Sequence, residues 1–213
     1  MHIKPPYLAR LFFPQLLWEI DTDSKEIFLT FDDGPHPEIT PRVLEILDGY
    51  NAKATFFCVG ENVKKYPKTY ASILKNGHQT GNHSFSHLNG WKTSNKDYFD
   101  NIKQCSQLID SRLFRPPYGR ISPSQIKSLK HQYKIVMWSA VTYDFDKSVT
   151  PSQCLENALK YPKAGSIVVF HDSAKASTNL FYALPRFLQN YTEKGFAFNV
   201  IPDSGSVNSS HQK

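Results

Sequence analysis

Short apolar runs recur along the chain and alternate with stretches in which apolar residues have a helical spacing. Seven of the runs are predicted to be strands, at 26–31, 54–59, 78–81, 112–115, 133–140, 166–170 and 197–201. Helices are predicted at 40–49, 62–76, 95–110, 151–160 and 180–194. The pattern is clearest in 95–110, where apolar residues recur at steps of three and four. Strands that alternate with helices indicate parallel βα units of an α/β protein.

Seven such units indicate a closed or nearly closed barrel. The length of 213 residues fits one domain, since α/β barrels commonly run to about 200–250 residues as a single unit. We expect this domain to span 26–202. The polar, low-complexity end of the chain, 203–213, is expected to be a flexible tail.

The first 25 residues contain an apolar stretch, YLARLFFPQLLW, that we expect to pack on the barrel. It is shorter than the about 20 residues that span a bilayer, and contact with a membrane surface is the less favoured expectation. No cleavage site of a signal peptide is recognisable there. On that basis we expect a cytoplasmic location, with action at the cell envelope as the alternative. We also expect a monomer.

Charge and cysteine content exclude some functions. The net charge is +6, but the lysines are dispersed and no nucleic-acid-binding motif is present, so we expect no nucleic-acid partner. The three cysteines, Cys58, Cys105 and Cys154, are odd in number and widely spaced, which argues against a disulfide framework and a zinc finger. We expect them to be small buried hydrophobes, as suits a reducing compartment.

Polar side chains that could take part in catalysis or metal binding occur where the predicted strands end. A turn alone would explain the adjacent aspartates of TFDDGPHP, but in barrels of parallel strands chemistry collects at the C-terminal strand ends. The residues at these positions are Asp32 and Asp33, His83 and His87, Arg115 and Tyr118, Asp144, and His171 and Asp172. We therefore predict one site formed by several strand ends.

Two of these residues, His83 and His87, are spaced to hold one metal ion. They are four residues apart and share a face on a helical turn, although two unrelated surface histidines would give the same pattern. An aspartate from another strand end would complete a three-ligand site with open positions, which is typical of catalytic metal centres. Nitrogen and oxygen ligands suit Zn²⁺, and also cobalt, nickel, manganese or iron.

The paired aspartates allow a division of labour. Asp33 can turn toward the metal while Asp32 approaches a metal-activated water as general base. His171 is a candidate acid for the leaving group, with a buried structural histidine as the alternative. Arg115 could hold Asp32 ionised, and the backbone N–H of Tyr118 could stabilise an oxyanion.

Taken together, the motifs resemble those of polysaccharide deacetylases of the NodB-homology type (carbohydrate esterase family 4). The matching stretches, in family order, are TFDDG at 30–34, HSFSH at 83–87, RPPYG at 115–119, WSAVTYDF at 138–145 and VFH at 169–171. The resemblance implies a distorted (β/α) barrel. It also implies metal-dependent hydrolysis of an N-acetyl, or sometimes O-acetyl, group on an acetylated carbohydrate.

The resemblance implies a role for each matching residue. Asp33, His83 and His87 would be the metal ligands, and Asp32 would be the general base. Arg115 would position Asp32.

Three further roles follow from the same resemblance. His171 would be the general acid, and Asp144 would raise its pKa by holding a negative charge nearby. Tyr118 would supply the oxyanion N–H.

The sequence departs from the family pattern near the substrate. Val141 stands where the family usually has aspartate, Phe145 where it has tryptophan and Val169 where it has leucine. Trp91 could stack on a sugar face, with simple packing as the alternative. The predicted substrate-contacting residues are Pro116, Pro117, Phe145, Val169 and Trp91.

Three other functions are compatible with parts of the pattern. A deformylase of a lipid-linked amino sugar would release formate instead of acetate. A catalytically inactive carbohydrate-binding homologue would bind without turnover, which the altered fourth motif permits. A non-haem iron oxygenase also uses two histidines and a carboxylate, but the second aspartate beside the ligand argues against it.

Overall fold

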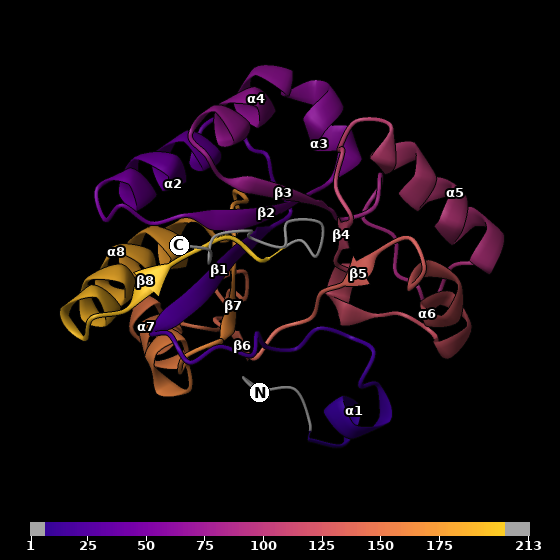
Figure 1. The fold of residues 1–213 in the computed structure, drawn as a ribbon. Helices are drawn as coiled ribbons and strands as arrows, with labels where there is room; N and C mark the ends of the chain where they lie inside the picture. The colour runs from indigo at the N-terminus through magenta and orange to yellow at the C-terminus, as the bar shows by residue number, and fades with distance from the viewer. Residues whose placement is uncertain (1–6, 203–213) are drawn as a thin grey trace, which may run out of the picture.

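The computed structural model describes residues 7–202, and its centre is one curled sheet of parallel strands (Figure 1). Seven strands follow the order β5-β4-β3-β2-β1-β7-β6, and β8 pairs with β1. The strands are β1 (Glu26–Asp32), β2 (Ala54–Cys58), β3 (Gln79–Asn82), β4 (Leu113–Phe114), β5 (Lys134–Ile135), β6 (Ala140–Val141), β7 (Ile167–His171) and β8 (Ala197–Phe198). The predicted α/β architecture, a distorted barrel of about seven strands, is confirmed.

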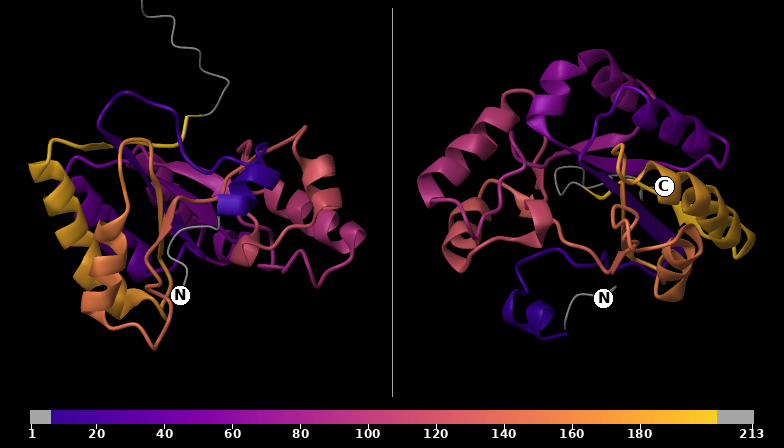
Figure 2. Two further views of the ribbon diagram at one scale, coloured as in Figure 1. Left: turned by 90° about the horizontal axis from the view of Figure 1, so that it is seen from below. Right: turned by 180° about the vertical axis from the view of Figure 1, so that it is seen from behind.

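Helices surround the outer side of this sheet (Figures 1 and 2). They are α2 (Ile39–Asp48), α3 (Gly60–Lys65), α4 (Pro67–Lys75), α5 (Asn95–Ser106), α6 (Pro123–Leu129), α7 (Pro151–Lys160) and α8 (Ser177–Glu193), with a short 3-10 turn η1 (Pro117–Gly119). The short helix α1 (Tyr7–Phe12) lies apart from them, beside the open side of the sheet (Figure 1). Capping boxes set the starts of α6 and α7, where Ser122 and Thr150 each accept a backbone N–H three residues ahead. No helix between residues 7 and 202 is both long enough and apolar enough to cross a membrane.

The core lies between the sheet and the helices. The strand β1 is buried from Ile27 to its end, as expected of a central parallel strand covered on both faces. Phe31 stacks on Phe56 at 4.9 Å between ring centroids, and Phe170 packs edge-on against Phe187 of α8. Cys58, Cys105 and Cys154 are buried and unpaired, as predicted.

The parallel register brings the strand ends to one rim. Asp32 at the end of β1 lies opposite His171 at the end of β7 and Phe57 of β2. Asn82 of β3 lies opposite Phe114 of β4. The residues that follow these strand ends therefore project from the same edge of the sheet.

One predicted strand was wrong in extent. The run 133–140 is not continuous: it forms β5 and β6, which lie at opposite ends of the strand order. Between them the chain pairs with Leu17, whose N–H donates to Ile135 O at 2.9 Å and whose carbonyl accepts from Met137 N–H at 2.7 Å. The segment after α1 thus runs along the open side of the sheet (Figure 1) and takes over backbone partners there.

One predicted helix is interrupted, and two short helices were not predicted. The helix expected at 62–76 is divided into α3 and α4 at Tyr66, whose φ of −127° and ψ of 57° are not helical. Pro67 explains the break, because proline disfavours helical geometry in the residue before it. The unpredicted helices are α1 and α6.

The domain boundaries remain predictions. Leu16 and Trp18, in the segment expected to pack on the barrel, are buried beside residues of α5 and α6. The expected flexible tail at 203–213 lies outside the described residues.

Candidate active site

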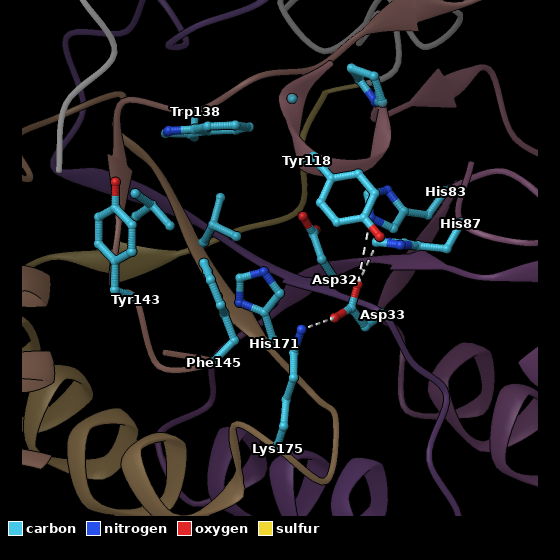
Figure 3. Close-up of a pocket in the computed structure, with 14 residues that line it drawn as sticks. Asp32, Asp33, His83, His87, Tyr118, Trp138, Tyr143, Phe145, His171 and Lys175 are labelled. Atoms are coloured by element: carbon cyan, nitrogen blue, oxygen red, sulfur yellow. Dashed lines mark ion pairs between the residues drawn. The ribbon is translucent and has the colours of Figure 1, made fainter. Parts of the chain in front are cut away.

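The C-terminal rim of the sheet holds a pocket in which most of the predicted site residues meet (Figure 3). The predicted residues that line it are Asp32, Asp33, His83, His87, Pro116, Tyr118, Phe145, Val169 and His171. Arg115 and Asp144 do not line the pocket but bond to residues that do. Side chains from β1, β3, β4 and β7 therefore come together although they are far apart in sequence.

Asp33, His83 and His87 form a cluster with the composition of a metal site. One ligand atom from each lies within 4.8 Å of the others. Asp33 Oδ1 is 3.1 Å from His87 Nε2 and 3.8 Å from His83 Nε2. Asp33 and His87 both have positive φ, 78° and 55°, which turns the backbone after each strand so that the side chains converge.

The ring of His83 is fixed in the orientation that a metal ligand needs. Its Nδ1–H donates to the backbone carbonyl of Arg115 at 2.8 Å, which leaves Nε2 as the atom facing Asp33. Burial lowers the pKa of His83 to about 4, and the negative charge of nearby Asp32 offsets only part of that decrease. The imidazole is therefore neutral at physiological pH, as metal binding requires.

Burial alone would raise the pKa of Asp33, but a hydrogen bond from His87 and the positive charge of nearby His171 hold it well below its usual range. Asp33 is thus ionised. A neutral His83 and an ionised Asp33 make this donor set fit a divalent cation with mixed nitrogen and oxygen preference.

Asp32 is paired with Arg115 in the interior. The Arg115 guanidinium is fully buried and donates to Asp32 Oδ1 at 2.7 Å. It also donates to Thr30 Oγ1 at 2.7 Å and to the carbonyl of Met137 at 2.8 Å, and it lies over the Phe57 ring. Several acceptors therefore fix the guanidinium, and its charge-assisted hydrogen bond holds the Asp32 carboxylate in one orientation.

His171 is paired with Asp144 on the other side of the pocket. Asp144 Oδ1 is 2.8 Å from His171 Nδ1, and Asp144 Oδ2 accepts the backbone N–H of His171 at 2.7 Å. Burial would lower the pKa of His171, but the buried carboxylate outweighs it and raises the pKa to about 9. His171 therefore carries a proton at neutral pH, and its Nε2–H is available to the pocket.

Asp172 holds the loop that carries Asp33. Its carboxyl accepts the N–H of Gly34 at 3.1 Å and the hydroxyl of Thr40 at 2.5 Å, and burial raises its pKa to about 8. A Cβ on Gly34 would lie 2.1 Å from the Asp172 carboxyl, so glycine is required there. The sequence pattern included Asp172 in the strand-end set but gave it no role.

Five residues that sequence reasoning did not assign to the site also line the pocket: Gly119, Trp138, Val141, Tyr143 and Lys175. Trp138 and Tyr143 belong to the stretch WSAVTYDF, so a signal for them existed. Gly119 ends the RPPYG motif, and Val141 had been singled out only as a departure from the family pattern. Lys175 lies in the turn before α8, where no motif pointed to it.

Two predicted substrate residues, Trp91 and Pro117, are not among those that line the pocket. The Trp91 indole is 60% exposed, donates from Nε1 to the carbonyl of Ile121 at 3.0 Å and stacks with Arg120. Pro117 is buried in η1. Tyr118, the next residue, has a φ of 60° and places its ring 4.6 Å from that of His87.

Comparisons with known proteins identify the family. The chain matches the family described as "Polysaccharide deacetylase" over residues 19–136. It is 34% identical to a peptidoglycan-N-acetylglucosamine deacetylase of Bacillus cereus, over 87% of this chain and 91% of that protein. The chain belongs to the polysaccharide deacetylase family, an enzyme class that removes acetyl groups from polysaccharides and oligosaccharides.

Two further relatives support the assignment. A chitooligosaccharide deacetylase of Azorhizobium caulinodans is 33% identical over 72% of this chain and 76% of that protein. A crystal structure of a peptidoglycan N-acetylglucosamine deacetylase bound to 4-naphthalen-1-yl-N-oxidanyl-benzamide superposes with a TM-score of 0.85 at 31% identity. That match covers 93% of this chain and 95% of the other.

Proposed function

We propose that this protein is a metal-dependent hydrolase that removes the N-acetyl group from an amino sugar within an oligosaccharide or polysaccharide. The observation that carries the proposal is the meeting of three units in one pocket. They are the cluster of Asp33, His83 and His87, the carboxylate of Asp32 beside it, and the protonated His171 on the opposite side. The N-acetylglucosamine named for several of its relatives supports an amide over an ester.

Asp33, His83 and His87 would hold the metal, and Zn²⁺ is the best match to one carboxylate and two imidazoles, with Co²⁺, Ni²⁺ or Mn²⁺ as substitutes. When bound, such an ion supplies Lewis acidity: it lowers the pKa of a water molecule to about 7 and polarises a carbonyl oxygen.

Asp32 is the proposed general base. It takes a proton from the water molecule as the water oxygen attacks the acetyl carbonyl carbon. Arg115 fixes the orientation of this carboxylate through the 2.7 Å bond. The backbone N–H of Tyr118 is the proposed donor to the developing oxyanion.

His171 is the proposed general acid. The bond between the carbonyl carbon and the sugar nitrogen breaks as His171 donates its proton to that nitrogen, which gives a free amine and acetic acid; the acid then loses the second proton of the water to solvent and becomes acetate. Asp144 stabilises the protonated imidazole before this transfer. The proton that Asp32 received later returns to His171, and both residues regain their starting states.

The test is acetate release by zinc-reconstituted protein from N-acetylglucosamine oligomers, peptidoglycan fragments, acetylated xylan and a lipid-linked amino sugar, with formate measured in parallel. We expect acetate from an N-acetylated substrate and a loss of about 10²–10⁴-fold in Asp32→Asn, as expected for a general base. Asp100→Asn is the matched control, because Asp100 is exposed and pairs with Lys96 on α5.

Other outcomes would redirect the assignment. Formate without acetate would make the protein a deformylase. Tight binding of an oligomer without turnover, in wild type and Asp32→Asn alike, would identify a binding protein.

A further inference from the structure

Lys175 places a cation inside the pocket, in the turn between β7 and α8. Its Nζ is 3.9 Å from Asp33 Oδ2 and 5.2 Å from the centroid of the Phe145 ring. Its side chain is about half exposed, at 52%. Figure 3 shows the side chain extending from the turn toward Asp33, beside His171 and Phe145. The Phe145 ring thus lies beside the ammonium group and holds it near the reaction centre.

The charges around Lys175 are otherwise matched within the protein. Asp32 pairs with Arg115, and Asp144 pairs with His171. Within residues 7–202, Asp33 is the carboxylate that lies within ion-pair distance of Lys175, and Asp33 is the proposed metal ligand. A divalent cation on Asp33 would neutralise the charge that faces Lys175. The ammonium group would then be left without a matching charge at the pocket rim.

We propose that Lys175 binds a carboxylate on the substrate, and that the protein prefers an acidic amino sugar to a neutral one. This inference rests on the proposed function. The ring carbon that carries the acetamido group is adjacent to the carbon that carries the 3-oxygen. A carboxyalkyl ether on that oxygen therefore places its carboxylate close to the reacting amide. A charge-assisted hydrogen bond from Lys175 would fix that carboxylate while the acetyl group faces Asp32 and His171.

The test compares two oligomers of equal length, one of N-acetylglucosamine and one whose alternate sugars carry a 3-O-lactyl carboxylate. The proteins are zinc-reconstituted wild type, Lys175→Met, Lys175→Arg and Lys160→Met. Lys160 is the matched control, because it also lies over an aromatic ring, that of Tyr161, but does not line the pocket.

We expect wild type to have the lower KM for the acidic oligomer. Lys175→Met should raise that KM by about tenfold, the loss expected for one charge-assisted contact, and change the KM of the neutral oligomer less than about twofold. Lys175→Arg should restore part of the preference, and Lys160→Met should match wild type. Esterifying the carboxylate should remove the preference from wild type.

Equal effects of Lys175→Met on both oligomers would overturn the inference. So would unchanged KM values with tighter zinc binding by calorimetry, since Lys175 would then only compete with the metal. Activity on both oligomers without preference would leave the proposed deacetylase standing and remove this inference alone. Calorimetric binding of the oligomers to Asp32→Asn, with and without Lys175→Met, repeats the comparison without turnover and tests the inference even if no acetate is released.

Discussion

The two carboxylate–cation pairs of the pocket, Asp32 with Arg115 and Asp144 with His171, are alike in distance and differ in their cations. The closest nitrogen–oxygen distances are 2.7 and 2.8 Å. Arg115 is fully buried and keeps its charge at any physiological pH, whereas His171 can lose its proton. In the first pair the carboxylate faces the pocket, and in the second pair the imidazole does.

This difference matches the two proposed roles. A base must face the attacking water in a fixed orientation, and a buried cation that cannot titrate holds the Asp32 carboxylate in place. An acid must be protonated at the start yet able to give the proton away, and a carboxylate behind an imidazole achieves this by raising its pKa to about 9. The same kind of ion pair can therefore serve two different roles, depending on which partner faces the substrate.

The largest expected effect comes from breaking the permanent pair. Arg115→Met removes the buried cation and leaves the Asp32 carboxylate without its partner, so we expect a loss of about 3–5 kcal/mol in the free energy of unfolding. Acetate release should fall as well, because Asp32 loses its orientation. Denaturant unfolding of the metal-free protein measures the stability change.

The control for this substitution is Arg10→Met. Arg10 pairs with Glu19 at 3.1 Å, but both side chains are partly exposed, so the expected loss is at most about 1 kcal/mol. Equal losses in the two variants would mean that the Asp32–Arg115 pair contributes no more than a surface pair.

Breaking the titratable pair, Asp144 with His171, should change the pH dependence of acetate release more than its maximal rate. Asp144→Asn removes the carboxylate that holds the pKa of His171 at about 9, so the pKa should fall toward its usual 6.5. The alkaline limb of the rate profile should then shift toward neutral pH, with the largest loss of activity near pH 8–9. Rate profiles of the two proteins measure this. Asp146→Asn is the control: Asp146 is a partly exposed neighbour that accepts the N–H of Ser148, and its substitution should leave the alkaline limb at its wild-type pH.

The same pair should contribute to stability in a defined pH window. The pKa of folded His171 is raised from 6.5 to about 9, so its stabilisation is complete below pH 6.5 and is lost as pH rises through about 9. The stability difference between wild type and Asp144→Asn, both metal-free, should therefore shrink from pH 6 to pH 10, by on the order of 3 kcal/mol. A difference that is constant with pH would contradict the proton assignment.

The fold was predictable where the pattern is local. The alternation of apolar runs and helical stretches was enough to indicate a parallel barrel, because each βα unit carries its own periodicity. The division of the run 133–140 into two strands was not predictable, because it depends on pairing with Leu17, more than a hundred residues earlier in the chain. Pro67 carried a local signal for the break between α3 and α4, and that signal was outweighed by the continuing apolar spacing.

The candidate site was predictable to the extent that its residues occur in short motifs at strand ends. Asp32, Asp33, His83 and His87 meet in space because parallel strands end at one rim. Lys175 reaches the pocket only through the conformation of the turn that precedes α8, which no spacing reveals. Trp91 is the opposite case, since its position directly after the HSFSH motif suggested a contact that the folded loop does not place in the pocket.

The smallest effect is expected from a substitution in the pocket wall. It tests whether Phe145 influences the pKa of His171 or only packs against the Asp144–His171 pair. Phe145 lies edge-on to His171, with 4.7 Å between ring centroids, and Phe145→Trp restores the residue that the family pattern usually has. The Asp144–His171 contact remains intact, so the alkaline limb should stay at its wild-type pH. KM should change by less than about tenfold, as expected when one aromatic contact worth about 0.5–1.5 kcal/mol is exchanged for another. pH–rate profiles of wild type and Phe145→Trp measure this. An alkaline limb displaced by a full pH unit would mean that Phe145 helps to set the pKa of His171. The contrast between the two ion pairs would then depend on the pocket wall as well as on their cations.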